Sequence, residues 1–182
     1  MRKYKRGKYT KKLIDDYCVL DIETTGLSFH NDKIIEIGIL KIRKNKIIKR
    51  YQQLIDPQVP ISAFITSLTG ITEKMVENQP LIDDIYNDVM DFIGDDIIVG
   101  HNTSFDLNFI ANSFRIDLNN EYMDTVQFSR IVYPQLKHHR LTDMVEYLHL
   151  SNNEHRAIAD CIATYELYEN CKKKIAESHY HL

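Results

Sequence analysis

The sequence predicts an α/β domain with three layers and a mixed sheet, and three observations lead to this fold class. Residues 17–22 form a short apolar run rich in β-branched side chains, which is typical of a buried strand. Two further runs, 34–40 and 47–55, flank Lys44-Asn45, a pair that predicts a tight turn and therefore a hairpin. Downstream, segments with helical spacing of apolar residues alternate with short strand-like runs. A hairpin followed by such alternation indicates helices packed on both faces of a sheet.

The segments after the hairpin supply the helices and the remaining strands. We expect three helices before the fourth strand: at 62–68 with a stop at Gly70, after a cap at Thr72, and over 82–93. The following segments are expected to form strands at 97–99 and 122–126 and helices at 104–114, with Ser104 as cap, 127–133, 141–148 and 157–173. The result is a five-stranded mixed sheet flanked by helices. Residues 1–14, which are basic, and 176–182 are expected to be tails on one domain that spans 15–175.

The bulk composition is that of a soluble protein with one hydrophobic core. The chain has 182 residues, of which 43% are hydrophobic and 27% charged, ordinary values for a globular domain. No apolar run approaches the ~20 residues that span a bilayer, and the basic N-terminus lacks the apolar segment of a secretory signal. Cys18, Cys161 and Cys171 have no metal-ligand spacing, so we expect reduced thiols in a cytoplasmic protein.

The charge is distributed unevenly along the chain. The net charge is −3, the first twelve residues carry +7, and the others therefore carry −10. The basic residues of that first segment are Arg2, Lys3, Lys5, Arg6, Lys8, Lys11 and Lys12. An acidic body needs bound cations where it receives a phosphate backbone, because metal ions reverse the local field. The basic segment either attracts phosphates without regard to sequence or is a solvated terminus, and both interpretations stay open.

Asp21 and Glu23 stand at the end of the first predicted strand. Residues i and i+2 of a strand point to the same face, so both carboxylates emerge together at the edge where α/β sheets gather their sites. Two adjacent acids repel each other unless a cation lies between them. Acids also flank ordinary strands, so the pair by itself fits a structural role as well.

Asp106 is expected in the first turn of the helix that follows the fourth strand. The helix dipole favours an acid there, which is a sufficient structural reason for it. His101 and Asn102 add polar side chains at the strand end, and Phe105 adds a ring on which a base could stack. Each of these three also fits a packed structural residue.

His155 and Asp160 form the third element. Five residues of helix rotate through ~140° net, so the two side chains cannot share a face of one continuous helix. We therefore expect His155 on a loop and Asp160 in the first turns of the last helix, where its apolar neighbours make a carboxylate costly unless it is paired or bound to metal. Hard divalent cations prefer oxygen ligands, and a histidine, with its usual pKa of ~6.5, suits a general base. The four acids and the histidine together indicate a two-metal nuclease.

These motifs together resemble the DEDDh (DnaQ-like) family of 3′-to-5′ exonucleases, of the proofreading type found in the epsilon subunit of DNA polymerase III and in PolC. The three matching motifs are 21–27 (DIETTGL), 101–106 (HNTSFD) and 155–160 (HRAIAD). Residues 68–72 and 139–141 also resemble family signatures, although Thr69 stands where the family often has a histidine. The resemblance covers residues 17–168, almost the whole chain.

The resemblance implies an RNase H-like fold and a site for two divalent ions, Mg²⁺ or Mn²⁺. It implies that Asp21, Glu23 and Asp160 bind one ion. Asp21 would be the main ligand of the other ion, with Asp106 bound to it directly or through water. His155 would be the general base. The residues expected around the 3′-terminal nucleotide are Thr24, Thr25, Gly26, Leu27, His101, Asn102 and Phe105.

The expected function is metal-dependent release of nucleoside 5′-monophosphates from single-stranded 3′ ends of DNA, as in proofreading and repair, with a DNA polymerase subunit as a possible partner and no membrane. The same motifs fit trimming of RNA or short oligoribonucleotides, because the site grips phosphates and a terminal sugar. A non-catalytic module that binds nucleic acid or a polymerase is a second class, against which the intact acids argue. A nucleotide-binding α/β protein is weakly supported, since the six glycines form neither Gly-x-Gly-x-x-Gly nor a P-loop.

Overall fold

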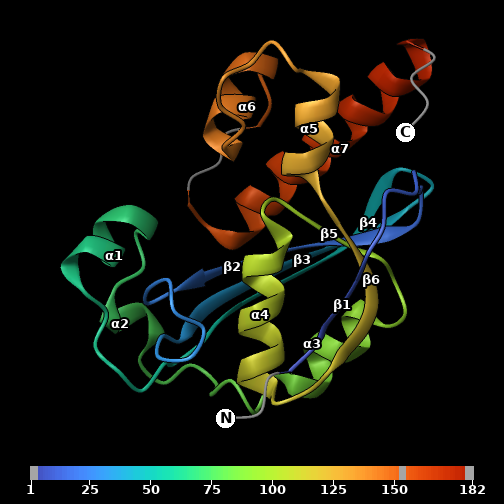
Figure 1. Cartoon of the computed structure of the whole chain (residues 1–182). Coiled ribbons are helices and arrows are strands. Elements are labelled where there is room, and N and C mark those ends of the chain that lie inside the picture. Colours follow the sequence, from blue (N-terminus) through green and yellow to red (C-terminus); the bar gives the residue numbers. More distant parts are fainter. Residues whose placement is uncertain (1–3, 152–154, 179–182) are drawn as a thin grey trace.

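The computed structural model describes residues 4–151 and 155–178. Its centre is a sheet of six strands in the order β1-β6-β5-β2-β3-β4 (Figure 1). The strands are β1 (Arg6–Tyr9), β2 (Tyr17–Thr24), β3 (Ile34–Arg43), β4 (Lys46–Leu54), β5 (Ile98–Gly100) and β6 (Leu118–Asp124). Strand β3 is antiparallel to β2 and β4, whereas β2, β5, β6 and β1 pair in parallel, so the sheet is mixed, as predicted.

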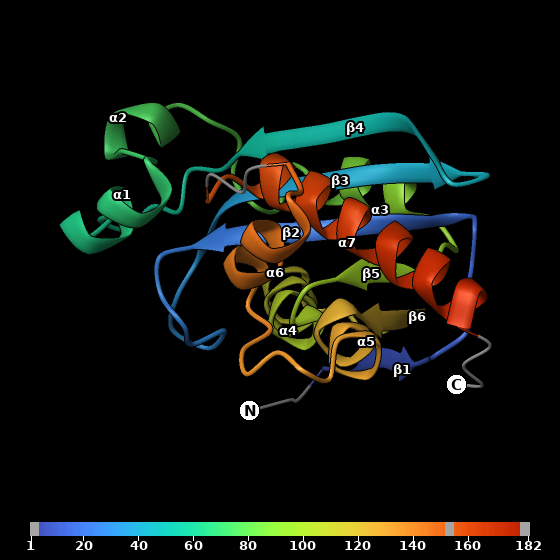
Figure 2. The same cartoon turned by 90° about the horizontal axis from the view of Figure 1, so that it is seen from above.

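Helices cover both faces of this sheet. They are α1 (Ala63–Thr69), α2 (Glu73–Val76), α3 (Tyr86–Ile93), α4 (Thr103–Phe114), α5 (Thr125–Val132), α6 (Leu141–Leu148) and α7 (Ala157–Ser178). Helices α5, α6 and α7 lie on one face, and α3 and α4 lie on the other (Figures 1 and 2). The short helices α1 and α2 lie beyond one end of the sheet (Figure 2). The described chain is therefore the three-layer α/β fold that the sequence predicted.

Alternation of side chains along β2 divides the core between the two faces. Leu20 and Ile22 belong to the apolar cluster under α3 and α4, and Val19 belongs to the cluster under α5, α6 and α7. Asp21 and Glu23 continue the series of Val19, because they follow it at intervals of two residues. The strand therefore directs both carboxylates toward the face that α7 covers.

Local signals placed the hairpin and the first helix as expected. Lys44 and Asn45 have φ values of 50° and 61° and make the two-residue turn between β3 and β4. Ser62 caps α1 by accepting a hydrogen bond from the Ile65 N–H, and Gly70 ends the helix in the left-handed conformation.

Three boundary predictions were wrong. Helix α4 begins at Thr103 rather than at Ser104, because the Thr103 hydroxyl donates to the Met123 carbonyl and Asn102 takes the cap position. Strand β6 runs from residue 118 to 124, and Asp124 then caps α5. Helix α3 begins at residue 86, four residues later than its apolar spacing suggested.

The sheet has six strands where five were predicted, because β1 lies within the segment 1–14 that was assigned to a basic tail. Tyr9 of this strand packs edge-on against Tyr122 of β6, with ring centroids 5.7 Å apart. Gly7 has a φ of 81°, and a Cβ there would lie 2.0 Å from the Asn120 carbonyl oxygen. Lysine and arginine at alternate positions hid the strand from sequence patterns, which rely on apolar periodicity.

Two further observations concern the whole described chain. The three cysteines are buried free thiols, as predicted. Within residues 4–151 and 155–178, no helix combines the length and apolar character that crossing a bilayer requires. Helix α7 extends to residue 178, past the predicted domain end at 175, and the division of the chain into a domain and two tails stays a prediction.

Candidate active site

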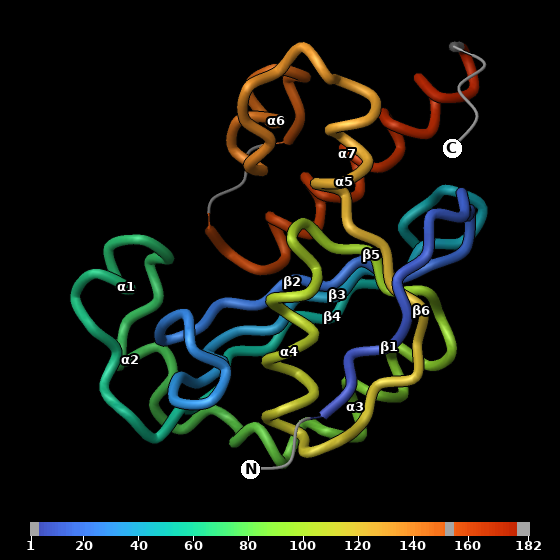
Figure 3. Tube along the Cα trace, in the orientation of Figure 1, coloured from blue at the N-terminus to red at the C-terminus, as the bar shows by residue number. Residues whose placement is uncertain are grey.

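Three carboxylates from two elements converge at the C-terminal end of β2. Asp21 and Glu23 come from that strand, and Asp160 comes from the first turn of α7, where it was predicted. One oxygen from each lies within 4.8 Å of the others. The end of β2 and the start of α7 are far apart in sequence but lie side by side (Figure 3). We call Asp21, Glu23 and Asp160 the acidic cluster.

A glycine in the neighbouring strand lets α7 come this close. Gly38 of β3 pairs with Asp21, and a Cβ on it would lie 2.6 Å from the backbone carbon of Ala157 and 2.7 Å from the nitrogen of Ile158. Any larger residue would push the start of α7, and with it Asp160, away from the sheet. The sequence carries a signal for this role that was not used, since an isolated glycine inside a strand pattern marks close backbone approach.

Asp106 reaches β2 from α4, on the opposite face of the sheet. Its side chain is 4% exposed, and its Oδ1 accepts a hydrogen bond of 3.2 Å from the Ile22 N–H. Because Ile22 lies between Asp21 and Glu23, Asp106 adjoins the acidic cluster. Among the described residues, however, Asp106 is not one of the three acids whose oxygens lie within 4.8 Å of one another. After burial, the negative charge of Asp106 is the main cause that raises the pKa of Asp21 well above its usual value.

Burial and mutual repulsion disfavour full ionisation of the acidic cluster. Burial, followed by the charge of Asp160, raises the pKa of Glu23 to about 8. Burial, followed by the charge of Glu36, raises the pKa of Asp160 to about 7. The Oδ1 atom of Asp160 is buried and has no hydrogen-bond partner in the part of the chain that the structure describes. The acidic cluster thus concentrates negative charge and contains an unsatisfied oxygen.

These properties fit a hard divalent cation. A cation would offset the burial and the repulsion that raise the three pKa values and would satisfy the Asp160 oxygen. The donors are carboxylate oxygens, which suit Mg²⁺ or Mn²⁺, whereas zinc sites favour sulfur and nitrogen.

A hollow of about 430 Å³ opens beside the acidic cluster. Its wall is made by Asp21, His101, Arg140, Leu141, Thr142, His155 and Asp160. His155 lies on the loop before α7, as predicted, in a left-handed backbone conformation with φ 49°. The structure therefore places His155 in one hollow with two of the acids.

His101 lines this hollow but is held by protein partners on both sides of its ring. Its Nδ1 lies 2.9 Å from Thr125 Oγ1, and its Nε2 lies 2.9 Å from the carbonyl oxygen of His139. A carbonyl can only accept, so Nε2 carries the hydrogen, and burial lowers the pKa of the ring. The sequence left open a polar side chain for substrate or a packed structural residue, and in the structure the imidazole links the end of β5 to α5 and to the loop before α6.

The other two residues predicted beside Asp106 are not fully buried. Asn102 is exposed, has a φ of 64° and donates its backbone N–H to Asp124 Oδ1. The ring of Phe105 is partly buried, with its centroid 4.9 Å from that of Phe109. Both retain a side chain that a ligand could reach.

The loop after β2 is closed on itself and presents one apolar side chain. The Thr24 hydroxyl donates to the Gly26 carbonyl at 2.6 Å, and the Thr25 hydroxyl lies 3.4 Å from Asp32 Oδ1. A Cβ at Gly26 would lie 2.6 Å from the Asp32 carboxylate, so a larger residue there would displace the Asp32 side chain. Leu27 is 85% exposed, so its side chain is available for contact.

Two residues beside the cluster were missed by the sequence analysis. Glu36 of β3 pairs with Glu23 in the strand register, and its carboxylate is bonded to Arg156, which directly follows His155. The available signal was a glutamate inside the apolar run at 34–40, since a buried carboxylate is costly unless it is paired.

Comparisons with known proteins identify the family of this chain. A family model described as Exonuclease matches residues 18–168. The chain is 42% identical over 167 residues to DNA polymerase III PolC-type of Clostridium perfringens, which covers 90% of this chain. It is 39% identical over 175 residues, 94% of this chain, to the protein of the same name from Caldanaerobacter subterraneus subsp. tengcongensis. The chain spans about 12% of the length of these two relatives.

A solved exonuclease structure has the same fold as this chain. Exonuclease X, solved in complex with 5′ overhanging duplex DNA, superposes with a TM-score of 0.72 and 26% sequence identity. The match covers 91% of this chain and 94% of that chain, so the RNase H-like fold that the motifs implied is confirmed.

Proposed function

Because this chain belongs to the exonuclease family, we propose that it is a metal-dependent 3′-to-5′ exonuclease that releases nucleoside 5′-monophosphates from the 3′ ends of DNA. The observation that carries this proposal is the convergence of Asp21, Glu23 and Asp160 within 4.8 Å, beside a hollow that His155 also lines. DNA as the substrate is supported by the relatives named DNA polymerase III and by the likeness to an exonuclease solved with DNA.

The carboxylate donors suit Mg²⁺ or Mn²⁺, and we infer two such ions, as the family resemblance implies. Asp21, Glu23 and Asp160 would hold one of them, and Asp21 with Asp106 would hold the other. Such ions, when bound, supply positive charge that stabilises the phosphate during displacement.

The protein groups have separate tasks in this reaction. His155 accepts, at a ring nitrogen, the proton of the water that attacks the terminal phosphodiester. The exposed Leu27 and the partly exposed Phe105 offer apolar contact to the last bases. The loop at 24–27 positions Leu27, because its internal hydrogen bonds fix the backbone.

Degradation of matched oligonucleotides tests the proposal. Single strands of DNA and RNA with the same sequence and a 5′ label are incubated with the protein in Mg²⁺ and in excess chelator. We expect a ladder that shortens from the 3′ end of DNA, and no shortening in chelator. Activity that persists in chelator would refute the metal-dependent mechanism, and preferential loss of the RNA would replace DNA by RNA as the substrate. Binding without degradation would favour a non-catalytic module.

An association with a DNA polymerase is the second part of the proposal and rests on the names of the relatives. Proofreading requires that the 3′ end of a growing strand reach this site. We expect the protein to shorten a primer with a mispaired 3′ end faster than a fully paired primer, because the unpaired end is single-stranded. Equal rates on the two primers would argue against a proofreading role.

A further inference from the structure

Glu36 is a carboxylate inside the sheet. Its exposed fraction is 0%, and it lies in β3 between Ile35 and Ile37, which are also fully buried. A carboxylate in such surroundings costs several kcal/mol unless its oxygens are paired. Its bonding therefore has to be accounted for in full.

Both carboxylate oxygens of Glu36 are occupied by donors from three elements. The Arg156 guanidinium donates from Nη2 to Oε1 at 2.6 Å and from Nε to Oε2 at 3.0 Å, a two-point contact. The Ala157 N–H donates to Oε2 at 3.0 Å, and Gln52 Nε2 of β4 donates to Oε1 at 2.9 Å. Because its oxygens are already bonded to protein, Glu36 is a holder of other groups rather than a further ligand in the acidic cluster.

The groups that Glu36 holds form the first turn of α7. The N–H groups at the start of a helix have no hydrogen-bond partner within the helix, and that of Ala157 is one of them. Glu36 of β3 accepts a hydrogen bond from it and so caps α7 from the sheet. The carbonyl of Arg156 accepts hydrogen bonds from the N–H groups of Ala159 and Asp160, at 2.8 and 3.0 Å. Arg156 is therefore anchored by its side chain to the sheet and by its backbone to the residue that carries the cluster carboxylate.

The same anchor lies next to His155. His155 precedes Arg156 directly and has a left-handed backbone with φ 49°, a conformation that a non-glycine residue keeps only when its surroundings hold it. Glu36 bonds both the side chain of Arg156 and the backbone N–H of Ala157. These two bonds fix the direction in which the chain enters α7. Arg156 and Ala157, the two residues that Glu36 bonds, thus lie along the chain between the proposed base and the proposed metal ligand.

We propose that the ion pair of Glu36 and Arg156 positions His155 and Asp160 for the hydrolysis inferred above, on which this second proposal rests. In this role neither residue has to touch the substrate or the reacting atoms. The pair sets the relative placement of a proton acceptor and a carboxylate, and misplacement of catalytic groups by about 1 Å is sufficient to lower a rate about 10²-fold.

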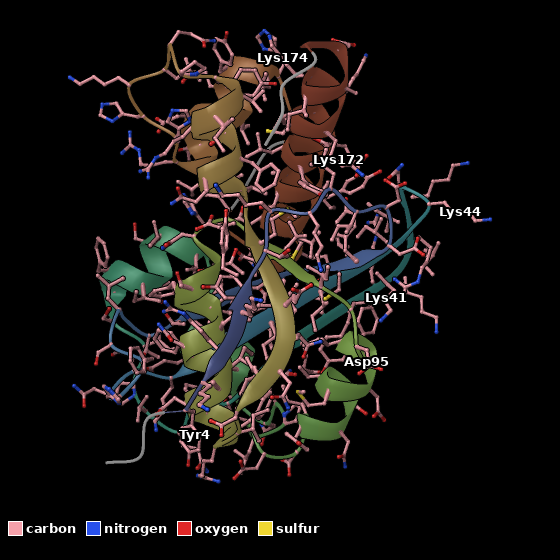
Figure 4. The ribbon with its side chains drawn as sticks, turned by 45° about the vertical axis from the view of Figure 1, so that its right-hand side comes forward. Tyr4, Lys41, Lys44, Asp95, Lys172 and Lys174 are labelled. Carbon is pink, nitrogen blue, oxygen red and sulfur yellow. The ribbon has the colours of Figure 1, made fainter. Side chains whose placement is uncertain are left out.

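The chain contains a matched control for this proposal. Arg43, at the other end of β3, makes a two-point contact with Asp96 at 2.9 and 3.0 Å. The two arginine side chains are similarly exposed, 34% for Arg43 and 31% for Arg156. Lys41, which also contacts Asp96, marks this end of the strand near Asp95 in Figure 4. Loss of the control pair removes the same kind of interaction from a place that does not adjoin the acidic cluster.

Three arginine variants test the proposal in the full chain: Arg156→Gln, Arg156→Lys and Arg43→Gln. We measure kcat and KM on a 5′-labelled DNA strand with Mg²⁺, together with thermal unfolding. We expect Arg156→Gln to lower kcat about 10²-fold with KM changed less than about threefold. Arg156→Lys should recover part of kcat, because it keeps the charge but loses the fork. Arg43→Gln should lower the melting temperature by a similar amount and leave kcat within about twofold of the parent.

Two results would overturn the positioning role: kcat unaffected in Arg156→Gln, or kcat reduced equally in Arg156→Gln and Arg43→Gln. If Arg156→Gln does not fold, Glu36→Gln replaces it, since that side chain keeps an acceptor for Ala157 but loses the charge. Calorimetric titration with Mn²⁺ separates this proposal from the function. We expect Arg156→Gln to weaken Mn²⁺ binding about tenfold and Arg43→Gln not to, even if the parent proves inactive on nucleic acid. A parent that binds no Mn²⁺ would overturn both proposals.

Discussion

The two helices that bring acids to the end of β2 begin alike but are completed differently. A residue in left-handed conformation precedes each helix: Asn102 before α4, with φ 64°, and His155 before α7, with φ 49°. Each helix then carries an acid in its first turn, Asp106 or Asp160. Asp106 accepts the N–H of Ile22, whereas Oδ1 of Asp160 has no partner within the described ranges.

Asp106 thus has one oxygen bonded by the protein, whereas Asp160 keeps a buried oxygen that no described group satisfies. At the start of α4, Asp106 both bonds to β2 and adds negative charge to the site. The start of α7 is held by Glu36 and Arg156. Its Asp160 nevertheless has an unsatisfied oxygen and lies close to two other acids. The structure thus stabilises the backbone around Asp160 while leaving its carboxylate free to bind.

The largest effect is expected from removing the charge of Asp160. Asp160→Asn should lower kcat on the order of 10³-fold, because the acidic cluster then has one fewer anionic ligand for the cations that stabilise the phosphate. Single-turnover degradation of labelled DNA measures this. Glu177→Gln, which changes an exposed acid of the same helix, is the control and should be fully active. A rate for Asp160→Asn within tenfold of the parent would remove Asp160 from the reaction.

The second largest effect is expected at the residues in left-handed conformation that precede the two helices. His155→Ala should lower kcat about 10²- to 10⁴-fold, the contribution of a general base, while the Kd for single-stranded DNA changes little. Asn102→Ala places alanine in the same kind of backbone conformation and should cost far less activity. Rate and binding assays on both variants decide between the roles, since an equal loss of rate and affinity in His155→Ala would make it a binding residue.

Metal-free protein should lose stability as the pH rises. The pKa of Asp160 is raised to about 7 and that of Glu23 to about 8, above the values of the unfolded chain, so the folded state binds more protons than the unfolded state between pH 4 and 8. This stabilisation is complete below about pH 4 and is lost as the pH rises through 7 to 8. We expect the melting temperature in chelator to fall between pH 5 and pH 8 by roughly 5 °C or more.

Added Mn²⁺ should reverse this loss, and more strongly at pH 8 than at pH 5, where protons compete for the carboxylates. Saturation at 100 times the Kd would add about 2.7 kcal/mol. Thermal unfolding with and without Mn²⁺ at the two pH values is the measurement. A melting temperature that does not change with pH in chelator would mean that the cluster is not repulsive.

The smallest effect is on the free energy of unfolding, which should fall when Asp106 is removed but not when Asp160 is removed. Asp106→Ala should lower the free energy of unfolding by about 1–3 kcal/mol, because the buried N–H of Ile22 loses its acceptor. Asp160→Ala in chelator at pH 8 should not lower it, because the change removes repulsion and an unsatisfied oxygen. Urea unfolding of the two variants compares them, and equal destabilisation would show that the two helix starts are completed in the same way.

Much of the fold followed from local patterns in the sequence. The turn at Lys44-Asn45 and the cap at Ser62 were predicted because their chemistry acts within four residues. Strand β1 was missed because its alternating basic residues conceal the strand period and its pairing partner lies more than a hundred residues away. Local propensity does not contain that kind of pairing.

The motifs also led to the family, which the comparisons confirm, and to the acids that the structure brings together. For His101 the sequence left a substrate contact and a structural role open, and the structure shows both ring nitrogens bonded within the protein. A histidine at a strand end has the same appearance in sequence whether its ring faces a ligand or a carbonyl. The identity of its partners depends on which loop packs over it.

The sequence by itself determined which side chains share a face within one element, since Asp21 and Glu23 are two residues apart in a strand and must point the same way. The tertiary structure alone decided that Asp160 comes within 4.8 Å of them. That approach requires the bare backbone of Gly38 under α7 and the bond from Ala157 to Glu36, both between residues more than a hundred positions apart. Backbone geometry sets direction over a few residues, whereas packing sets the distance between elements.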